Sequence, residues 1–248
     1  MSDRASGIED YVGFLQSLLE RTTEQFLFGG QAVNFWANYF DTKCQHSPLR
    51  ALRPFTSKDC DIWVSSRAWN EIQTMERRHL VKGSSPSDGQ LGILTLQHDP
   101  PRVVDLLSAV YGIRHEELGR LCERAPVFNG IKVIDPIYLF RSKCHCLLGL
   151  PQVDRQDVRH VRMLALILPE YISLLIEDVD QGNIPDRELL KEIKLLKKIS
   201  SSGACRHCLE SLGIESRTLI PWDRLARSRS DLLAKYAKSA MGKDAWSK

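Results

Sequence analysis

The chain has 248 residues, of which 43% are hydrophobic and 26% are charged, values that are ordinary for a folded globular protein. Its 34 basic and 31 acidic residues leave a formal net charge of only +3. Composition and length exclude collagen, low-complexity sequence and full-length disorder, and they allow one large domain or two modest ones with apolar cores.

The first half of the chain mixes helical and strand-like patterns. Apolar residues recur at helical spacing over residues 8–21, and the apolar run 25–28 then predicts a short buried strand that ends at Gly29-Gly30. The segments that follow predict helices over 31–40 and 66–78, a loop over 41–57, strands over 60–64, 91–97 and 103–107, a turn-rich loop over 83–89 and a hairpin over 127–133.

From residue 136 onwards the strand patterns stop. Helical spacing predicts helices over 136–149, 155–180 and 186–201, a shorter one near 204–212, and a last one from 222 to about 240. We therefore expect an α+β fold, with a mixed α/β domain over residues 1–135 followed by an all-helical domain over residues 136–248.

Charge is distributed unevenly between the two ends of the chain. Residues 186–248 carry 14 basic and 8 acidic residues, whereas residues 1–185 carry 20 and 23. A basic helical domain beside a slightly acidic body favours a polyanionic partner such as RNA, although solvated helix faces would give the same pattern.

The sequence indicates a cytoplasmic protein with reduced thiols and no membrane partner. Its N-terminal residues are acidic and polar, and its longest apolar run, residues 163–168, is far too short to cross a bilayer. The odd number of cysteines, seven, shows no repeating spacing. Cys144-x-Cys146 and Cys205-x-x-Cys208 contain possible zinc ligands, but helix positions i and i+2 diverge by roughly 200°, so we expect buried thiols instead.

Three acids are the strongest candidates for chemistry. Asp59 and Asp61 flank the start of the strand predicted over 60–64, and residues two apart on a strand point to the same face. Asp105 lies among apolar residues of the strand predicted over 103–107, where a carboxylate is costly to bury unless it is paired or binds a metal. If these strands are neighbours, the three carboxylates converge and can hold Mg²⁺ or Mn²⁺. The alternative for Asp105 is an edge-strand acid that faces water.

Residues near these acids could bind phosphate. Gly29 and Gly30, between a strand and a helix, let backbone N–H groups approach an anion at the helix N-terminus. Ser57 and Lys58 precede the first acid and could add a hydroxyl and an ammonium group to the same triphosphate.

The chain resembles the nucleotidyltransferase (DNA polymerase β-like) superfamily in the order of its elements. That order is a strand, Gly-Gly, a helix, Asp-x-Asp on the next strand, and an acid on a later strand. Over residues 24–160 the chain looks most similar to its bacterial AbiEii-type group, which is known for toxins of abortive-infection and toxin–antitoxin systems. Two further segments match that group, Arg141-Ser142-Lys143 and Asp154-Arg155-Gln156-Asp157. The sequence departs from the group in its long 41–57 loop and in the residue pattern of the second segment.

The resemblance implies a nucleotidyltransferase-like mixed sheet with flanking helices and transfer of an NMP from an NTP, such as ATP, to an acceptor hydroxyl. The acceptor would be an RNA 3′ end, a protein or a small molecule. The implied metal ligands are Asp59, Asp61 and Asp105, and Asp105 would help to deprotonate the acceptor. Lys143 would hold the nucleotide phosphates, although an exposed helix lysine is the alternative.

Two other functions remain open at this point. The first is a catalytically inactive module of the same fold that binds nucleotide or protein without turnover. The second is an interaction protein whose helical domain pairs with an antitoxin-like partner, in which case the acids are only surface charge.

Overall fold

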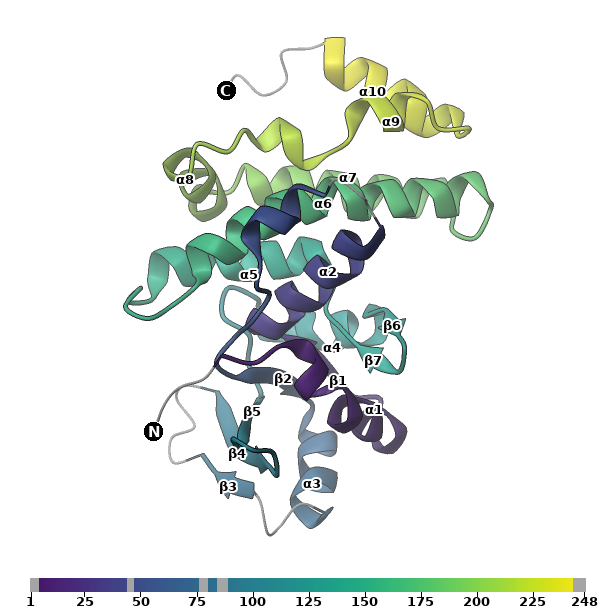
Figure 1. Cartoon of the computed structure of the whole chain (residues 1–248). Coiled ribbons are helices and arrows are strands. Elements are labelled where there is room, and N and C mark those ends of the chain that lie inside the picture. Colours follow the sequence, from purple (N-terminus) through teal and green to yellow (C-terminus); the bar gives the residue numbers. More distant parts are fainter. Residues whose placement is uncertain (1–4, 44–46, 76–79, 84–88, 243–248) are drawn as a thin grey trace.

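The computed structural model describes residues 5–43, 47–75, 80–83 and 89–242. A sheet and its helices form one end of the molecule, and helices alone form the other (Figure 1). The expected mixture of helices and a mixed sheet is therefore confirmed. Parts of the predicted 41–57 and 83–89 loops, and the end of the predicted 66–78 helix, lie outside the described residues.

The main sheet has five strands in the order β1-β2-β5-β4-β3. The neighbours β2 and β5 run parallel, and the other pairs run antiparallel. Both faces of β1 and nearly all of β2 are buried, which explains why apolar runs in the sequence predicted these strands. The bounds are β1 Gln25–Phe28, β2 Cys60–Val64, β3 Leu80–Lys82, β4 Gln90–Leu96 and β5 Arg102–Leu107.

A small hairpin of β6 (Val127–Phe128) and β7 (Ile131–Lys132) continues the sheet beyond β1. Val133 forms a parallel bridge with Leu27, and the Ile134 N–H donates to the Leu27 carbonyl at 3.0 Å. Asn129 and Gly130 both have positive φ angles, 51° and 75°, as the predicted two-residue turn requires.

The helices of the sheet end are α1 (Val12–Arg21), α2 (Gly29–Lys43), α3 (Ser66–Met75) and α4 (His115–Arg124). The interpretation of the sequence did not include α4, although its three buried residues, Leu118, Leu121 and Cys122, follow helical spacing. It also did not predict β3, a three-residue strand at the edge of the sheet with no buried residue.

The helical end contains α5 (Pro136–Gly149), α6 (Asp157–Asp180), α7 (Asp186–Ser200), α8 (Gly203–Ser211), α9 (Trp222–Ala226) and α10 (Asp231–Gly242). The Asp135 carboxylate caps α5 by accepting the N–H groups of Ile137 and Tyr138 at 3.0 and 3.1 Å. The long α6 packs against α5 and α2, which joins the helical end to the sheet end.

The prediction of one helix from 222 to about 240 is wrong, because the helix is interrupted between α9 and α10. Asp180 at the end of α6 accepts hydrogen bonds from the Ser228 hydroxyl at 2.7 Å and from the Arg229 N–H at 2.9 Å. The Ser230 hydroxyl then accepts the Leu233 N–H at 3.3 Å in the first turn of α10. These long-range polar contacts replace helical hydrogen bonds over residues 228–230.

Trp36 lies at the centre of the core that joins the two ends. Its indole N–H donates to the Ile134 carbonyl at 2.9 Å, and the side chain has no exposed surface. Its ring contacts Phe128 of the hairpin, with centroids 5.3 Å apart, and Tyr171 of α6 at 5.4 Å. The middle of α2 is therefore fixed to both ends of the molecule.

The six described cysteines are all buried free thiols, so the expectation of buried thiols is confirmed for them; Cys44 lies outside the described residues. Cys205 and Cys208 on α8 lie close to Cys144 on α5 and raise its pKa, a proximity that sequence spacing did not indicate. In the described part of the chain no helix combines the length and apolar character needed to span a bilayer.

Candidate functional site

The three candidate acids meet on the sheet near the start of β2. Asp61 on β2 is directly opposite Asp105 on the parallel strand β5, and Asp59 lies just before β2. One carboxylate oxygen from each of the three lies within 4.8 Å of the others. Residues far apart in the sequence are thus brought together by the parallel pairing of two strands.

Asp105 does not lie on an edge strand, so that alternative is wrong. Strand β5 lies between β2 and β4, and the Asp105 side chain is half-buried. Its carboxylate accepts a hydrogen bond from the Gln90 side-chain amide at 2.8 Å.

The carboxylates disfavour one another's negative charge. Burial, and then the charge of Asp59, raise the pKa of Asp61 to about 7 against the opposing charge of Lys143, while Asp105 raises it by less and the Gly30 N–H lowers it slightly. Burial and the Asp59 charge also raise the pKa of Asp105. A divalent cation would relieve this repulsion, and a set of three carboxylates suits the hard oxygen preference of Mg²⁺ or Mn²⁺.

The two glycines after β1 allow the chain to pass directly against Asp61. Gly29 has a φ of 67°, and a Cβ atom placed on it would lie 1.8 Å from the Asp61 Oδ2 atom. The Gly30 N–H donates to the Asp61 carboxylate. Both the backbone conformation and the close approach require glycine at position 29, and α2 begins at this residue.

A polar cleft of about 800 Å³ opens beside Asp59 and Asp61. One wall comes from the sheet end of the molecule and the other from the N-terminus of α6 and the loop before it. The residues that line it are Gly30, Ser57, Lys58, Asp59, Asp61, Lys143, Val153, Asp154, Arg155, Gln156, Asp157 and His160.

Lys143 is buried in this cleft and is not an exposed helix lysine. Its ammonium group lies 3.1 Å from Asp157 Oδ1, and the two side chains are only 7% and 2% exposed. Arg155 binds the other carboxylate oxygen of Asp157 at 2.6 Å. Although burial opposes it, the charges of Lys143 and Arg155 lower the pKa of Asp157. The two segments that carry the sequence resemblance therefore meet in one buried ion-pair network.

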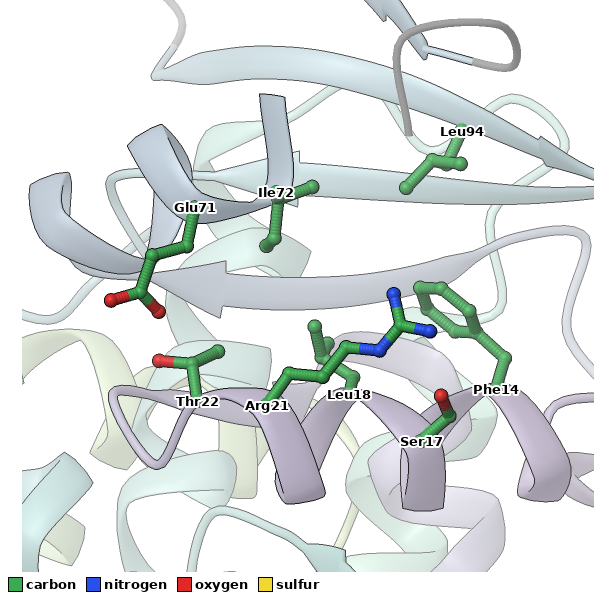
Figure 2. Close-up of a pocket in the computed structure, with 8 residues that line it drawn as sticks. All are labelled: Phe14, Ser17, Leu18, Arg21, Thr22, Glu71, Ile72 and Leu94. Carbon is green, nitrogen blue, oxygen red and sulfur yellow. The ribbon is translucent and has the colours of Figure 1, made fainter. Parts of the chain in front are cut away.

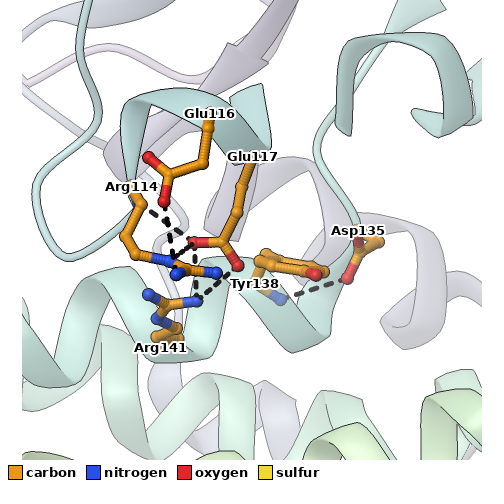
Figure 3. Close-up of polar contacts among 6 residues, drawn as sticks. All are labelled: Arg114, Glu116, Glu117, Asp135, Tyr138 and Arg141. Atoms are coloured by element: carbon orange, nitrogen blue, oxygen red, sulfur yellow. Dashed lines mark hydrogen bonds and ion pairs between the residues drawn. The ribbon is translucent and has the colours of Figure 1, made fainter. Parts of the chain in front are cut away.

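Arg141 belongs to the same segment but lies elsewhere. Figure 3 shows its guanidinium group against Glu117, which also binds Arg114 and so joins α4 to α5. Arg141 Nη1 lies 3.1 Å from Glu117 Oε1, and Arg114 Nε lies 3.1 Å from Oε2. Of the Arg141-Ser142-Lys143 segment, only Lys143 lines the cleft.

Ser57 and Lys58 both line the cleft, at the end of the long loop predicted over 41–57. Backbone hydrogen bonds of 2.8 and 2.9 Å link Ser57 to Ser6 near the N-terminus. Arg159 of α6 donates to the Leu52 and Pro54 carbonyls of the same loop. The described part of the loop is thus packed against α6 as a wall of the cleft.

Sequence reasoning missed His160 as a site residue. It lies one turn after Asp157 on α6, is 3% exposed and lines the cleft. A spacing of three residues on a helix places two side chains on one face, so the match at Asp157 was the signal that could have indicated it.

A second pocket lies between α1, α3 and β4, away from the acids (Figure 2). Its empty space is about 380 Å³, and apolar groups form most of its surface. The residues around it are Phe14, Ser17, Leu18, Arg21, Thr22, Glu71, Ile72 and Leu94. The polar cleft, in contrast, combines acids, cations and a helix N-terminus, and it is the candidate functional site.

Comparison with known proteins adds no family to this geometry. No model of a protein family matches the chain, and no curated protein has a significantly similar sequence.

Proposed function

We propose that the protein is a metal-dependent nucleotidyltransferase that transfers an NMP from an NTP to an acceptor hydroxyl. The observation that carries the proposal is the meeting of Asp59, Asp61 and Asp105 within 4.8 Å, beside a glycine turn at a helix N-terminus. Three converging carboxylates suit a divalent metal pair, the more so because the pKa values of Asp61 and Asp105 are raised, and the helix N-terminus suits phosphate.

Each part of the cleft has a role in this mechanism. Asp59, Asp61 and Asp105 would hold Mg²⁺ or Mn²⁺, which when bound would stabilise negative charge on the attacking hydroxyl and on the pyrophosphate. Asp105 would accept the proton of the acceptor hydroxyl. The turn at Gly29 and Gly30 leaves room for the phosphates to approach the backbone.

The cations on the opposite wall would neutralise the phosphate chain. Lys143 and Arg155 already share the single carboxylate of Asp157, so the ion-pair network has a surplus positive charge. A triphosphate that enters the cleft would find this charge fixed in place, so that little reorganisation is needed on binding. Lys58, near the first acid, would add another cation.

The basic helical end favours RNA over a small molecule as the acceptor. Lys197 lies over the rings of Trp222 and Tyr236, at 5.7 and 5.9 Å from the ring centroids, so cations and aromatic rings share one surface. Such surfaces bind nucleic-acid backbones and bases. An activity of this kind is compatible with the toxin role and the antitoxin partner that the sequence resemblance implies.

Label transfer tests the proposal directly. The purified protein is incubated with each α-³²P-labelled NTP, with Mg²⁺ or Mn²⁺, and with RNA and protein fractions of a cell extract. We expect one nucleotide to label one class of acceptor with release of pyrophosphate, and Asp59→Ala to abolish the label. Asp223→Asn, which removes an exposed acid on α9, is the matched control and should keep full activity.

Three results would contradict the proposal or narrow it. Absence of transfer with all four nucleotides would refute the enzymatic function, and transfer that persists in Asp59→Ala would refute the mechanism. Calorimetric binding of ATP with Mg²⁺ but without pyrophosphate release would instead favour the inactive binding module.

A further inference from the structure

His160 is buried in the cleft without a hydrogen-bond partner. Its side chain is 3% exposed, and within the described residues neither Nδ1 nor Nε2 has a partner. A buried polar atom that lacks a partner destabilises the folded state, so most such atoms in folded proteins are paired with protein, water or ligand. An apolar side chain of similar size would avoid this cost, which indicates that the imidazole serves a ligand.

The ring lies over the beginning of α2. A Cβ atom placed on Gly30 would lie 3.2 Å from His160 Cε1 and 2.4 Å from the Ser57 hydroxyl oxygen. The imidazole and the hydroxyl therefore flank the same backbone position, at a helix N-terminus where an anion is favoured. The absence of a side chain at Gly30 lets the Ser57 hydroxyl and the His160 ring lie this close to the backbone of α2.

The charges around His160 favour an anion as well. Burial, and then the nearby Lys143, lower the pKa of His160 well below its ordinary value; Asp157 opposes this shift, and Arg159 and Arg155 add smaller contributions to it. The ring is therefore neutral and offers one N–H donor. A bound phosphate would balance the one positive charge by which Lys143 and Arg155 together exceed Asp157.

We propose that His160 is a substrate-binding residue that donates a ring N–H to the phosphate chain of the bound nucleotide, above Gly30 and beside the Ser57 hydroxyl. This inference rests on the proposed function, because it concerns the same cleft. It adds a neutral donor, on the helical wall, to the cations already assigned there. It also assigns the orphaned nitrogens of a buried histidine to the substrate.

Inorganic tripolyphosphate with Mg²⁺ is the probe, because it tests the phosphate chain without any choice of base. We expect His160→Leu to weaken its binding roughly ten- to a hundredfold, the effect of losing one hydrogen bond to a charged group, and His160→Gln, which keeps an N–H donor, to recover most of the affinity. His98→Leu, on an exposed turn, is the matched control and should bind as the wild type does.

A second measurement follows the unmodified protein, and a variant serves only to assign its signal. The ring ¹⁵N–¹H signal of His160, assigned by its loss in His160→Gln, should move on addition of tripolyphosphate. A signal that does not move at saturation, or equal affinity in the wild type and His160→Leu, would overturn the inference while leaving the proposed function intact. Failure of the wild type to bind any NTP would overturn the proposed function, and this inference with it.

Discussion

Replacement of Asp61 by Asn tests the electrostatic reasoning most directly. The substitution keeps the shape of the side chain and an oxygen that can accept the Gly30 N–H, but it removes the charge that Asp59 and Asp105 repel. We expect Asp61→Asn to make the metal-free protein more stable at neutral and alkaline pH, although it removes a proposed metal ligand.

The magnitude follows from the pKa of Asp61, which is about 7 in the folded protein against an ordinary value of 3.8. Because the folded protein binds this proton more tightly than the unfolded chain, its metal-free stability falls as the pH rises from about 4 to about 7 and then stays constant. Three pKa units correspond to about 4 kcal/mol. This shift already includes the attraction to Lys143, but the Asp61 side chain is partly exposed and solvent screens the charges, so we expect a net gain of about 2 kcal/mol at pH 8 and less than about 1 kcal/mol at pH 5.

Urea unfolding with a chelator present, at pH 5 and at pH 8, measures this difference. Asp223→Asn is the control, and its unfolding free energy should match that of the wild type at both pH values. Addition of Mg²⁺ should stabilise the wild type more than Asp61→Asn, because the ion binds the folded state. A loss of stability in Asp61→Asn at pH 8 without metal would refute the claim that the three carboxylates repel one another.

Three further predictions concern the glycine turn, the ion-pair network and the core. Gly29→Ala should lower both stability, by more than about 1 kcal/mol, and label transfer, since its φ is positive and its Cβ would meet Asp61; wild-type activity would contradict the close approach. Lys143→Met should lower the free energy of unfolding in urea by about 3–5 kcal/mol, because it leaves the buried Asp157 short of a cation. The double variant with Asp157→Asn should recover part of this loss of stability. Strictly additive losses would argue against an interaction between Lys143 and Asp157. Trp36→Ala should cost about 3–5 kcal/mol by thermal or urea unfolding, and a loss below about 1 kcal/mol would show that Trp36 does not hold the two ends together.

Strands β1 and β2 could be predicted because both faces of β1 and nearly all of β2 are buried, so each strand is a largely apolar run in the sequence. The bounds predicted for β1 and β2 agree with the structure, and β5 differs by one residue. In contrast, the break between α9 and α10 depends on Asp180, a residue some fifty positions earlier in the chain. No local pattern contains that contact, so the sequence predicted a continuous helix there.

The candidate site divides in the same way. The convergence of the three acids followed from a local pattern in each strand and one assumption, that the strands are neighbours, and the structure pairs Asp61 with Asp105. The location of His160 depends instead on α6 lying against the start of α2, so that the ring meets Gly30. The three-residue spacing from Asp157 could indicate which face of α6 carries His160, but it does not indicate that this face packs over Gly30.

Helix α2 connects the glycine turn to the aromatic core through a single rigid element. Its first residues face the cleft, and Trp36, two turns further on, is fastened to the hairpin and to α6. The helix therefore cannot slide or tilt to accommodate a ligand in the cleft without disrupting the aromatic packing around Trp36. Substitutions in the aromatic packing around Trp36, away from the three acids, should consequently alter the proposed label transfer as well as lower the melting temperature.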